Sequence, residues 1–169
     1  NTTYLNSLDS TSQSMIGNTK YYLGGTADYW SDGYVDTPLQ FYSYERKIMN
    51  KPSISYFYSG NPNNWVGKLG LMYASDYGYA SENCEGKRIY DTRSLLYDIR
   101  ACNDTNWLYN INTHEWLLSQ VSTNKYYVFS ISSIGSIVTG GVTNRQYAVR
   151  PTLYLTSSVK ITGGSGTSS

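Results

Sequence analysis

Tyrosine supplies most of the aromatic rings in this chain: it occurs 19 times among 169 residues, against 3 Phe and 4 Trp. Each tyrosine ring buries about 150–250 Å² but carries a phenol oxygen that needs a hydrogen-bond partner. One small core cannot hold so many of these rings. We therefore expect some tyrosines on the surface, where a Tyr, Ser, Asn and Gly composition is typical of adaptable binding sites. High β-propensity is the alternative reason for the tyrosines, and the sequence leaves both open.

Charge is sparse and balanced, with 13 Lys and Arg against 12 Asp and Glu and a formal net charge of +1. Phosphate binding needs clustered Lys and Arg that release counterions, so we expect no nucleic-acid partner. No apolar run approaches the ~18 residues of a transmembrane helix, and no signal peptide is recognisable. We expect the chain to reach a membrane only through a segment that would precede Asn1, as in an ectodomain.

Two cysteines, Cys84 and Cys102, lie 18 positions apart among polar turn residues. A structural zinc site needs four ligands, and one cysteine pair with the single histidine does not supply them. In an exported protein, a disulfide closing this loop would stabilise the fold by roughly 3 kcal/mol. Polar surroundings favour the disulfide, and two buried free thiols in a cytosolic protein are the alternative.

The pattern along the chain predicts an α+β fold with short antiparallel strands, one or two helices and long irregular loops. Ser10 and Gln13 match a capping box, which predicts a helix near the start of the chain. A second short helix is predicted at residues 93–101 and a capped turn at 74–80, whereas residues 26–67 show little periodicity. The expected strands are residues 21–23, 53–58, 68–73, 126–131, 136–138 and 149–155, and the apolar residues at 107–108 and 116–118 flank a polar loop.

We expect a single domain over residues 1–162, followed by a Gly/Ser-rich tail at 163–169. Pro151 has no N–H to give to a sheet, so its strand should lie at an edge or carry a bulge there. Four large apolar side chains late in the chain are expected in the core: Trp107, Trp116, Leu153 and Leu155.

The search for catalytic motifs is negative, so we expect a protein that is not an enzyme. His114 is the only histidine, and Glu115 and Ser119 are near it in sequence. A Ser-His-acid triad depends on geometry that spacing alone does not establish, and no nucleophile elbow, phosphate loop or dinucleotide fingerprint is present. A hydrolase centred on His114 is the alternative. No cofactor is expected, although Asp, Asn and carbonyl oxygens leave a calcium ion open.

Hydrogen-bonding and stacking side chains are concentrated between Asn103 and Tyr147. Aromatic faces pack on apolar C–H surfaces and carboxamides bond hydroxyls or backbone groups, so this inventory suits recognition of a sugar or a polar protein surface. The alternative is that each residue serves its own loop backbone. The candidate ligand-binding residues are Tyr109, Asn110, Asn112, His114, Tyr126, Tyr127, Ser133, Asn144, Gln146 and Tyr147.

Several motifs occur in a specific order along nearly the whole chain. They are Tyr22-Leu23-Gly24-Gly25, the run from Gly67 to Ala80, the cysteine pair, Asn106-Trp107-Leu108, Trp116, the run from Ala148 to Leu155, and Gly163-Gly164-Ser165-Gly166-Thr167. In this order they resemble the C-terminal ectodomains of pilin-like surface proteins of gut bacteria. The resemblance implies a C-type lectin-like fold of the formylglycine-generating-enzyme subclass, as used by the variable proteins of diversity-generating retroelements.

The resemblance implies an adhesin-type domain on the bacterial cell surface, with a protein or glycan of another cell or of the host as its ligand. The acidic sugar motif of calcium-dependent lectins is absent, and Asn61-Pro62-Asn63 is the nearest sequence. Retroelement diversification of the positions after Asn103 would fit their Asn, Tyr and Ser content. A structural subunit of a surface filament, with filament neighbours and no separate ligand, is the alternative function.

Overall fold

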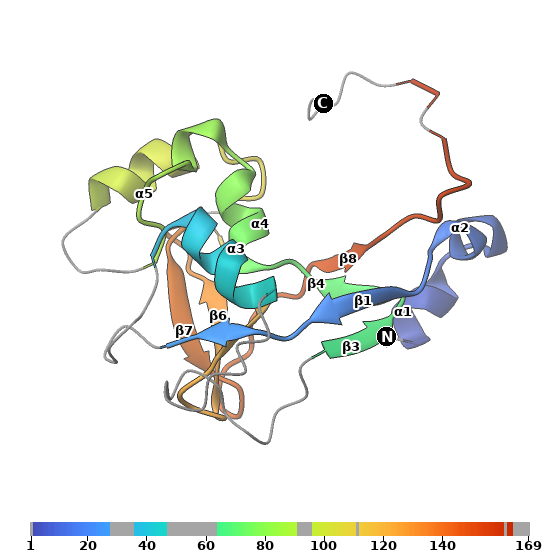
Figure 1. The fold of residues 1–169 in the computed structure, drawn as a ribbon, viewed down its shortest axis with the longest axis horizontal. Helices are drawn as coiled ribbons and strands as arrows, with labels where there is room; N and C mark the ends of the chain where they lie inside the picture. Colours follow the sequence, from blue (N-terminus) through green and yellow to red (C-terminus); the bar gives the residue numbers. More distant parts are fainter. Residues whose placement is uncertain are drawn as a thin grey trace.

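The computed structural model describes residues 2–27, 36–46, 64–90, 96–110, 112–160 and 162–163 (Figure 1). They form a mixed α+β fold, as the sequence predicts. Its helices are α1 (Thr2–Ser7), α2 (Ser10–Met15), α3 (Pro38–Arg46), α4 (Ala74–Tyr79), the 3₁₀ turn η1 (Glu82–Cys84) and α5 (Leu96–Asn103). Its strands are β1 (Thr19–Tyr22), β2 (Gly25–Thr26), β3 (Asn64–Gly67), β4 (Leu69–Leu71), β5 (Glu115–Val121), β6 (Tyr127–Ile131), β7 (Ile137–Gly141) and β8 (Pro151–Leu153). None of the described helices has the length and apolar composition needed to cross a bilayer.

The largest sheet has four strands in the order β2-β5-β6-β7. Burial along β5 alternates strictly, so every second side chain points to the core. Trp116 and the alternate residues that follow it lie on the opposite face of the strand. The predicted hairpin of β6 and β7 is confirmed, with Ser130 opposite Val138. Gly135 has a φ of 79° in the connecting turn, a conformation that favours glycine.

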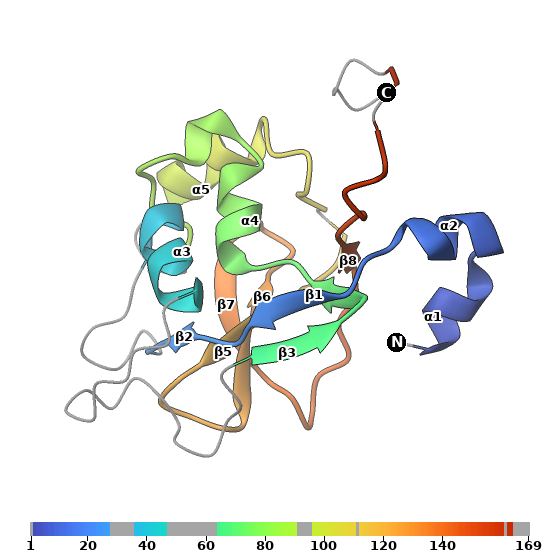
Figure 2. The same cartoon turned by 45° about the vertical axis from the view of Figure 1, so that its right-hand side comes forward.

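Helices α3 and α4 cover the core face of this sheet (Figures 1 and 2). Phe41 of α3 packs edge-on against Phe129 of β6, with 5.3 Å between the ring centroids. Tyr77 of α4 is buried in the same core, and its hydroxyl donates to the Gly135 carbonyl at 2.9 Å. The core therefore includes a tyrosine whose phenol oxygen is satisfied internally, as the composition requires.

Two small sheets bring early and late segments of the chain together. β1 pairs with β3 and β4 pairs with β8, while an isolated bridge links Ile16 to Leu155. Tyr21 of β1 is buried under this layer and stacks on Trp65 with 5.4 Å between ring centroids. A Cβ atom at Gly70 of β4 would collide with the Tyr21 ring, so this close approach requires glycine.

Helix α3 lies in a region for which the sequence predicted only irregular structure. Its start is a capping box: the Gln40 side-chain oxygen accepts from the Thr37 N–H at 3.1 Å and from the Thr37 hydroxyl at 3.0 Å. Pro38 occupies the first helical position, where its missing N–H costs nothing. The strand predicted at residues 53–58 falls outside the described residues.

Two further helices differ in detail from the prediction. Asp9, rather than Ser10, caps α2, because its carboxylate accepts from the N–H groups of Thr11 and Ser12 at 2.9 and 3.0 Å. The capped turn predicted at 74–80 is extended into helix α4. Its N-terminus is closed by the Asp76 carboxylate, which accepts from the Tyr73 N–H at 2.9 Å.

The predicted disulfide between Cys84 and Cys102 is confirmed, with 4.7 Å between the two Cα atoms. Both cysteines are buried. The bond ties η1 to α5 beside the helix α4 that covers the sheet. The disulfide therefore adds a covalent constraint to this outer helical layer.

The core prediction is wrong: none of its four residues belongs to the buried core. Trp107 is 68% exposed, and Leu153 and Leu155 are 36% and 53% exposed. Asn106 is buried in place of Trp107, because its carboxamide donates to the Tyr77 carbonyl at 2.9 Å and accepts from the Leu108 N–H at 3.0 Å. β8 pairs only with the short strand β4, so its apolar face has no covering layer among the described residues. Trp116 is half-buried on the outer face of the large sheet.

Candidate binding surface

The ten candidate ligand-binding residues all remain accessible to solvent to some degree. Asn110, Asn112, Tyr126, Tyr127, Asn144 and Gln146 are exposed, whereas Tyr109, His114, Ser133 and Tyr147 are half-buried. None of them belongs to the buried core. The structure divides them into three groups, which lie at the two ends of β6 and β7 and on the outer face of the sheet.

The first group surrounds the open end of the β6–β7 ladder, and we call it the tyrosine end: Tyr126, Tyr127, Val142 and Asn144. Tyr127 lies opposite Gly141, and the Val142 N–H donates to the Tyr126 carbonyl at 3.0 Å. The Asn144 side-chain oxygen lies 2.8 Å from the position of a Cβ atom on Gly141, so the carboxamide folds over the strand at that point. These four exposed residues therefore lie close together at the open end of the two strands.

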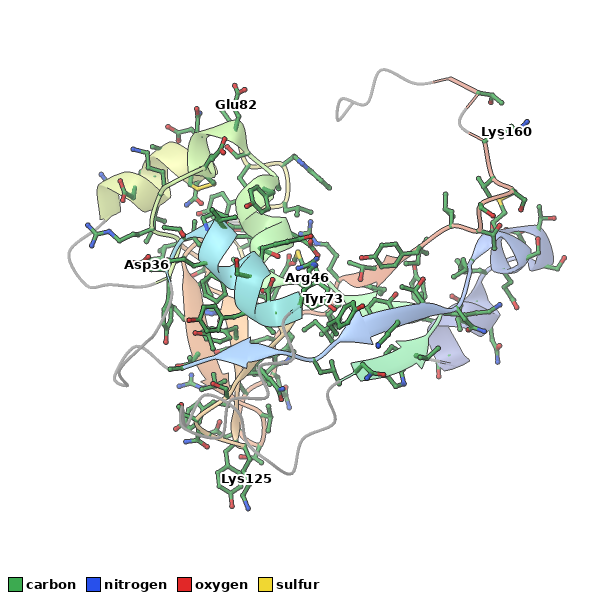
Figure 3. All side chains as sticks on the ribbon, in the orientation of Figure 1. Asp36, Arg46, Tyr73, Glu82, Lys125 and Lys160 are labelled. Carbon is green, nitrogen blue, oxygen red and sulfur yellow. A yellow bond between two sulfur atoms is a disulfide. The ribbon has the colours of Figure 1, made fainter. Side chains whose placement is uncertain are left out.

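The turn before β6 explains why the two tyrosines project from the sheet. The Asn124 side-chain oxygen accepts from the Tyr126 N–H at 3.0 Å, and the Asn124 carbonyl accepts from the Tyr127 N–H at 3.2 Å. This Asx turn satisfies the backbone without using either phenol. Lys125 Nζ lies 5.0 Å from the centroid of the Tyr126 ring. Figure 3 shows Lys125 at an extremity of the molecule, beyond the strand ends.

The second group lies at the opposite end of β6 and β7. The Tyr109 hydroxyl donates to the Ser133 carbonyl at 3.0 Å, so this phenol serves the turn between the two strands. The Asn110 side-chain oxygen accepts from the Asn112 N–H at 3.1 Å. Strands of this length separate the group from the tyrosine end by roughly 17 Å. The structure therefore does not bring the ten residues into one patch.

The third group is a ring stack on the outer face of the large sheet. Tyr147 stacks on His114 with 4.7 Å between ring centroids, and its ring is tilted by 39° against that of Trp116 at a centroid distance of 4.5 Å. His114 Nδ1 is buried and has no hydrogen-bond partner in the described part of the chain. Gln146 lies exposed beside the stack. In this arrangement the histidine contributes a flat apolar face.

A buried carboxylate that sequence reasoning missed connects α3, α4 and β5. Glu45 is 1% exposed, and its Oε1 atom accepts from the Ser75 N–H at 3.2 Å and from the Ser119 hydroxyl at 2.5 Å. Its Oε2 atom accepts from the Ser75 hydroxyl and from Arg46 Nη1, the latter at 3.2 Å. Burial raises the pKa of Glu45, while the serine and arginine donors act in the opposite direction. The carboxylate thus fixes both helices to the strand that leads to the tyrosine end.

Arg46 completes this network at the surface. Its guanidinium lies 4.3 Å from the ring centroids of both Tyr42 and Tyr73, and Nη2 pairs with the Asp76 carboxylate at 3.4 Å. Figure 3 shows Arg46 and Tyr73 next to each other where α3 approaches the strands. Cation–π contacts and ion pairs of this kind hold the arginine in one place. The signal in the sequence was the Glu45-Arg46 pair at the end of a capped helix.

A second buried carboxylate fixes the late part of the chain to β5. Glu115 is buried, and Oε1 accepts from Arg150 Nη2 at 2.7 Å. The backbone of Ala148 bonds on both sides of this position, to the Trp116 N–H at 3.0 Å and to the His114 carbonyl at 2.8 Å. These contacts hold the segment that follows the tyrosine end against β5. They give the surface residues a rigid support.

Within the described ranges, no three His, Cys, Asp or Glu side chains gather in a way that could hold a metal ion. The chemistry that the candidate surface offers is therefore that of aromatic rings, carboxamides and one lysine. Comparison of the chain with models of protein families, with curated proteins and with solved structures finds no match.

Proposed function

We propose that this chain is an extracellular ligand-binding domain of adhesin type, which recognises a glycan or a protein surface through the tyrosine end. The observation that carries the proposal is the shared exposure of Tyr126, Tyr127, Val142 and Asn144 on one rigid hairpin. The structure of short strands, a few helices and irregular connections supports a C-type lectin-like fold as the scaffold. The domain acts by contact and not as an enzyme.

The chemistry of the tyrosine end suits a ligand with both apolar C–H surface and polar groups. Tyrosine supplies a large, stiff contact area with only two rotatable side-chain bonds, so little entropy is lost on binding. The Asn144 carboxamide offers donors and an acceptor to hydroxyl or peptide groups, and Lys125 adds a cation beside the Tyr126 ring. This combination matches a sugar ring or a polar protein surface.

The disulfide supports an oxidising location for the domain, because such bonds persist outside the reducing cytosol. The motif order described above supports a bacterial cell surface and a pilus-like carrier. The coding DNA tests the proposal that the surface is diversified. A reverse-transcriptase gene nearby and a near-repeat differing at adenines are expected if a retroelement rewrites these positions, and an isolated gene without a repeat would contradict it.

We expect the double variant Tyr126→Ala/Tyr127→Ala to weaken ligand binding at least about 30-fold, since each ring at the centre of an interface contributes ~1 kcal/mol or more. The ligand is first found by screening the domain on a glycan array and against a panel of host surface proteins. Affinities of wild type and variants are then measured by biolayer interferometry. The matched control is Tyr42→Ala/Tyr79→Ala, which removes two tyrosines that are also about half exposed.

The control variant should bind within about twofold of wild type. Equal loss in both variants would show that exposed tyrosines act non-specifically and would contradict the proposal. Uniform failure to bind across both panels, together with self-assembly, would favour the second candidate function, a structural subunit of a surface filament. The exposed apolar surface around β8 is the observation that favours this second candidate.

A further inference from the structure

An apolar pocket of about 350 Å³ opens between the small sheets and the first helix. Its walls come from five separate elements, so it is a property of the folded chain rather than of one loop. Its lining includes Tyr4 of α1, Trp65 of β3, Leu69 of β4, Leu118 of β5, and Val149 and Pro151 at β8. Pockets that hold a small ligand or an inserted side chain begin at about this volume.

The pocket lies within a larger exposed apolar surface. Val149 is 61% exposed, and Tyr4 and Trp65 are both partly open to solvent. Leu153 lies opposite the pocket residue Leu69, and Val149, Pro151, Leu153 and Leu155 occupy alternate positions, so they share one face of the extended segment. Contiguous apolar surface of this kind marks an interaction site in a soluble domain. No charged side chain lines the pocket, so the group that enters it should be apolar.

The same chain exposes one large apolar side chain, Trp107, in a turn that follows α5. Trp107 is 68% exposed, the highest value among the large hydrophobic residues in the described part of the chain. The turn that carries it is closed by the Tyr109 N–H, which donates to the Asn106 carbonyl at 3.0 Å, and by the buried Asn106 side chain. Thr105 and Ser81 bond through their hydroxyls at 2.5 Å, next to the disulfide. The backbone that carries the indole is therefore held in place.

We propose that Trp107 of one copy inserts into the pocket of a second copy of this chain. An indole is apolar, flat and of the size that a pocket of this volume accepts, and its ring can stack against the aromatic wall formed by Trp65 and Tyr4. A preformed pocket and a preorganised side chain lose little entropy on association. The apolar strip of Leu153 and Leu155 beside the pocket extends the contact.

The geometry makes this contact heterologous. Trp107 follows α5, whereas the pocket lies among β3, β4, β8 and α1 on a different part of the molecule (Figures 1 and 2). A contact between two different surfaces leaves one pocket and one tryptophan unused at the ends of every oligomer that does not close into a ring. Copies therefore add head to tail. The tyrosine end is part of neither surface. Failure of the proposed assembly would therefore leave the proposed ligand binding unaffected, and the reverse also holds.

Two variants test the proposal together, by sedimentation velocity over a concentration series. Trp107→Ala removes the inserting side chain, and Val149→Glu places a charge in the pocket wall. Wild type should show a sedimentation coefficient that rises with concentration, and each variant alone should remain a monomer. Both positions are exposed, so the melting temperatures should match wild type. Leu39→Ala, at a residue 65% exposed on α3, is the control and should assemble like wild type.

Mixing the two variants gives the sharpest outcome. Val149→Glu retains its tryptophan and Trp107→Ala retains its pocket, so the mixture should form a 1:1 dimer and nothing larger. A monomeric mixture would overturn the proposal, as would assembly of Trp107→Ala alone. Loss of assembly in Val149→Glu but not in Trp107→Ala would point to a symmetric contact between two apolar strips and would also overturn it. Tyr126→Ala/Tyr127→Ala should assemble normally, which separates this test from that of ligand binding.

Discussion

Replacing Glu45 by alanine is expected to lower the free energy of unfolding by about 3–5 kcal/mol, because it leaves buried hydrogen-bond donors without their acceptor and opens a cavity between two helices and a strand. The variant leaves the Ser75 N–H and the Ser119 hydroxyl without their acceptor inside the core, and it leaves Arg46 with one carboxylate fewer. Unfolding in urea followed by circular dichroism measures the change. A stable domain of this size has only about 5–15 kcal/mol to lose, so the midpoint should fall strongly.

The matched control is Glu82→Ala, which removes a carboxylate that points away from the molecule (Figure 3). Its effect should stay within about 0.5 kcal/mol. An equal effect of the two substitutions would contradict the role given to Glu45. Destabilisation by Glu45→Ala alone would show that the carboxylate connects α3, α4 and β5.

Glu45→Gln separates the shape of the side chain from its charge and gives a pH test. Burial raises the pKa of Glu45 above its ordinary value of 4.5, so the native state holds the proton to a higher pH than the unfolded chain does. The stability from Glu45 is therefore complete below about pH 4.5 and is lost as the pH rises through the native pKa. Glutamine does not titrate. The unfolding free energy of wild type minus that of Glu45→Gln should fall as the pH rises above 4.5, and a rise would contradict the assignment.

Removing the disulfide is expected to cost about 3 kcal/mol in the double variant Cys84→Ser/Cys102→Ser, because the unfolded chain regains the entropy of an 18-residue loop. The loss should lower the melting temperature by roughly 6–12 °C for a domain of this size. Differential scanning calorimetry measures the shift. Reduction of the wild type should reproduce it, and reductant should leave the double variant unchanged. A melting temperature that does not respond to reduction would contradict a stabilising role.

Two features were predictable because their signals are local. The β6–β7 hairpin follows from apolar alternation on both sides of a turn that contains Gly135. The disulfide follows from a single pair of cysteines in polar surroundings. The capped start of α3 was equally local, with Thr37, Pro38 and Gln40 in sequence. It was missed because one of the positions that α3 buries is Glu45, and a search for apolar spacing does not count a carboxylate.

The rest depends on contacts between distant segments. Trp107 is larger and more apolar than Asn106, yet Asn106 is buried because it satisfies the Tyr77 carbonyl and the Leu108 N–H. Residue types correctly indicated an accessible surface rich in tyrosine and asparagine. They did not show that β6 and β7 separate Tyr109 from Tyr126, since that separation follows from strand pairing.

A nuclear magnetic resonance titration tests most directly whether the ligand binds at the tyrosine end. ¹⁵N-labelled domain is titrated with the tightest-binding glycan or protein fragment found in the screen, and shifts of the backbone amides are mapped. We predict that the largest shifts fall at residues 124–127 and 141–144, on both sides of the open end of β6 and β7. Shifts confined to the pocket around Trp65 or to the turn around Tyr109, with residues 124–127 unmoved, would contradict the account.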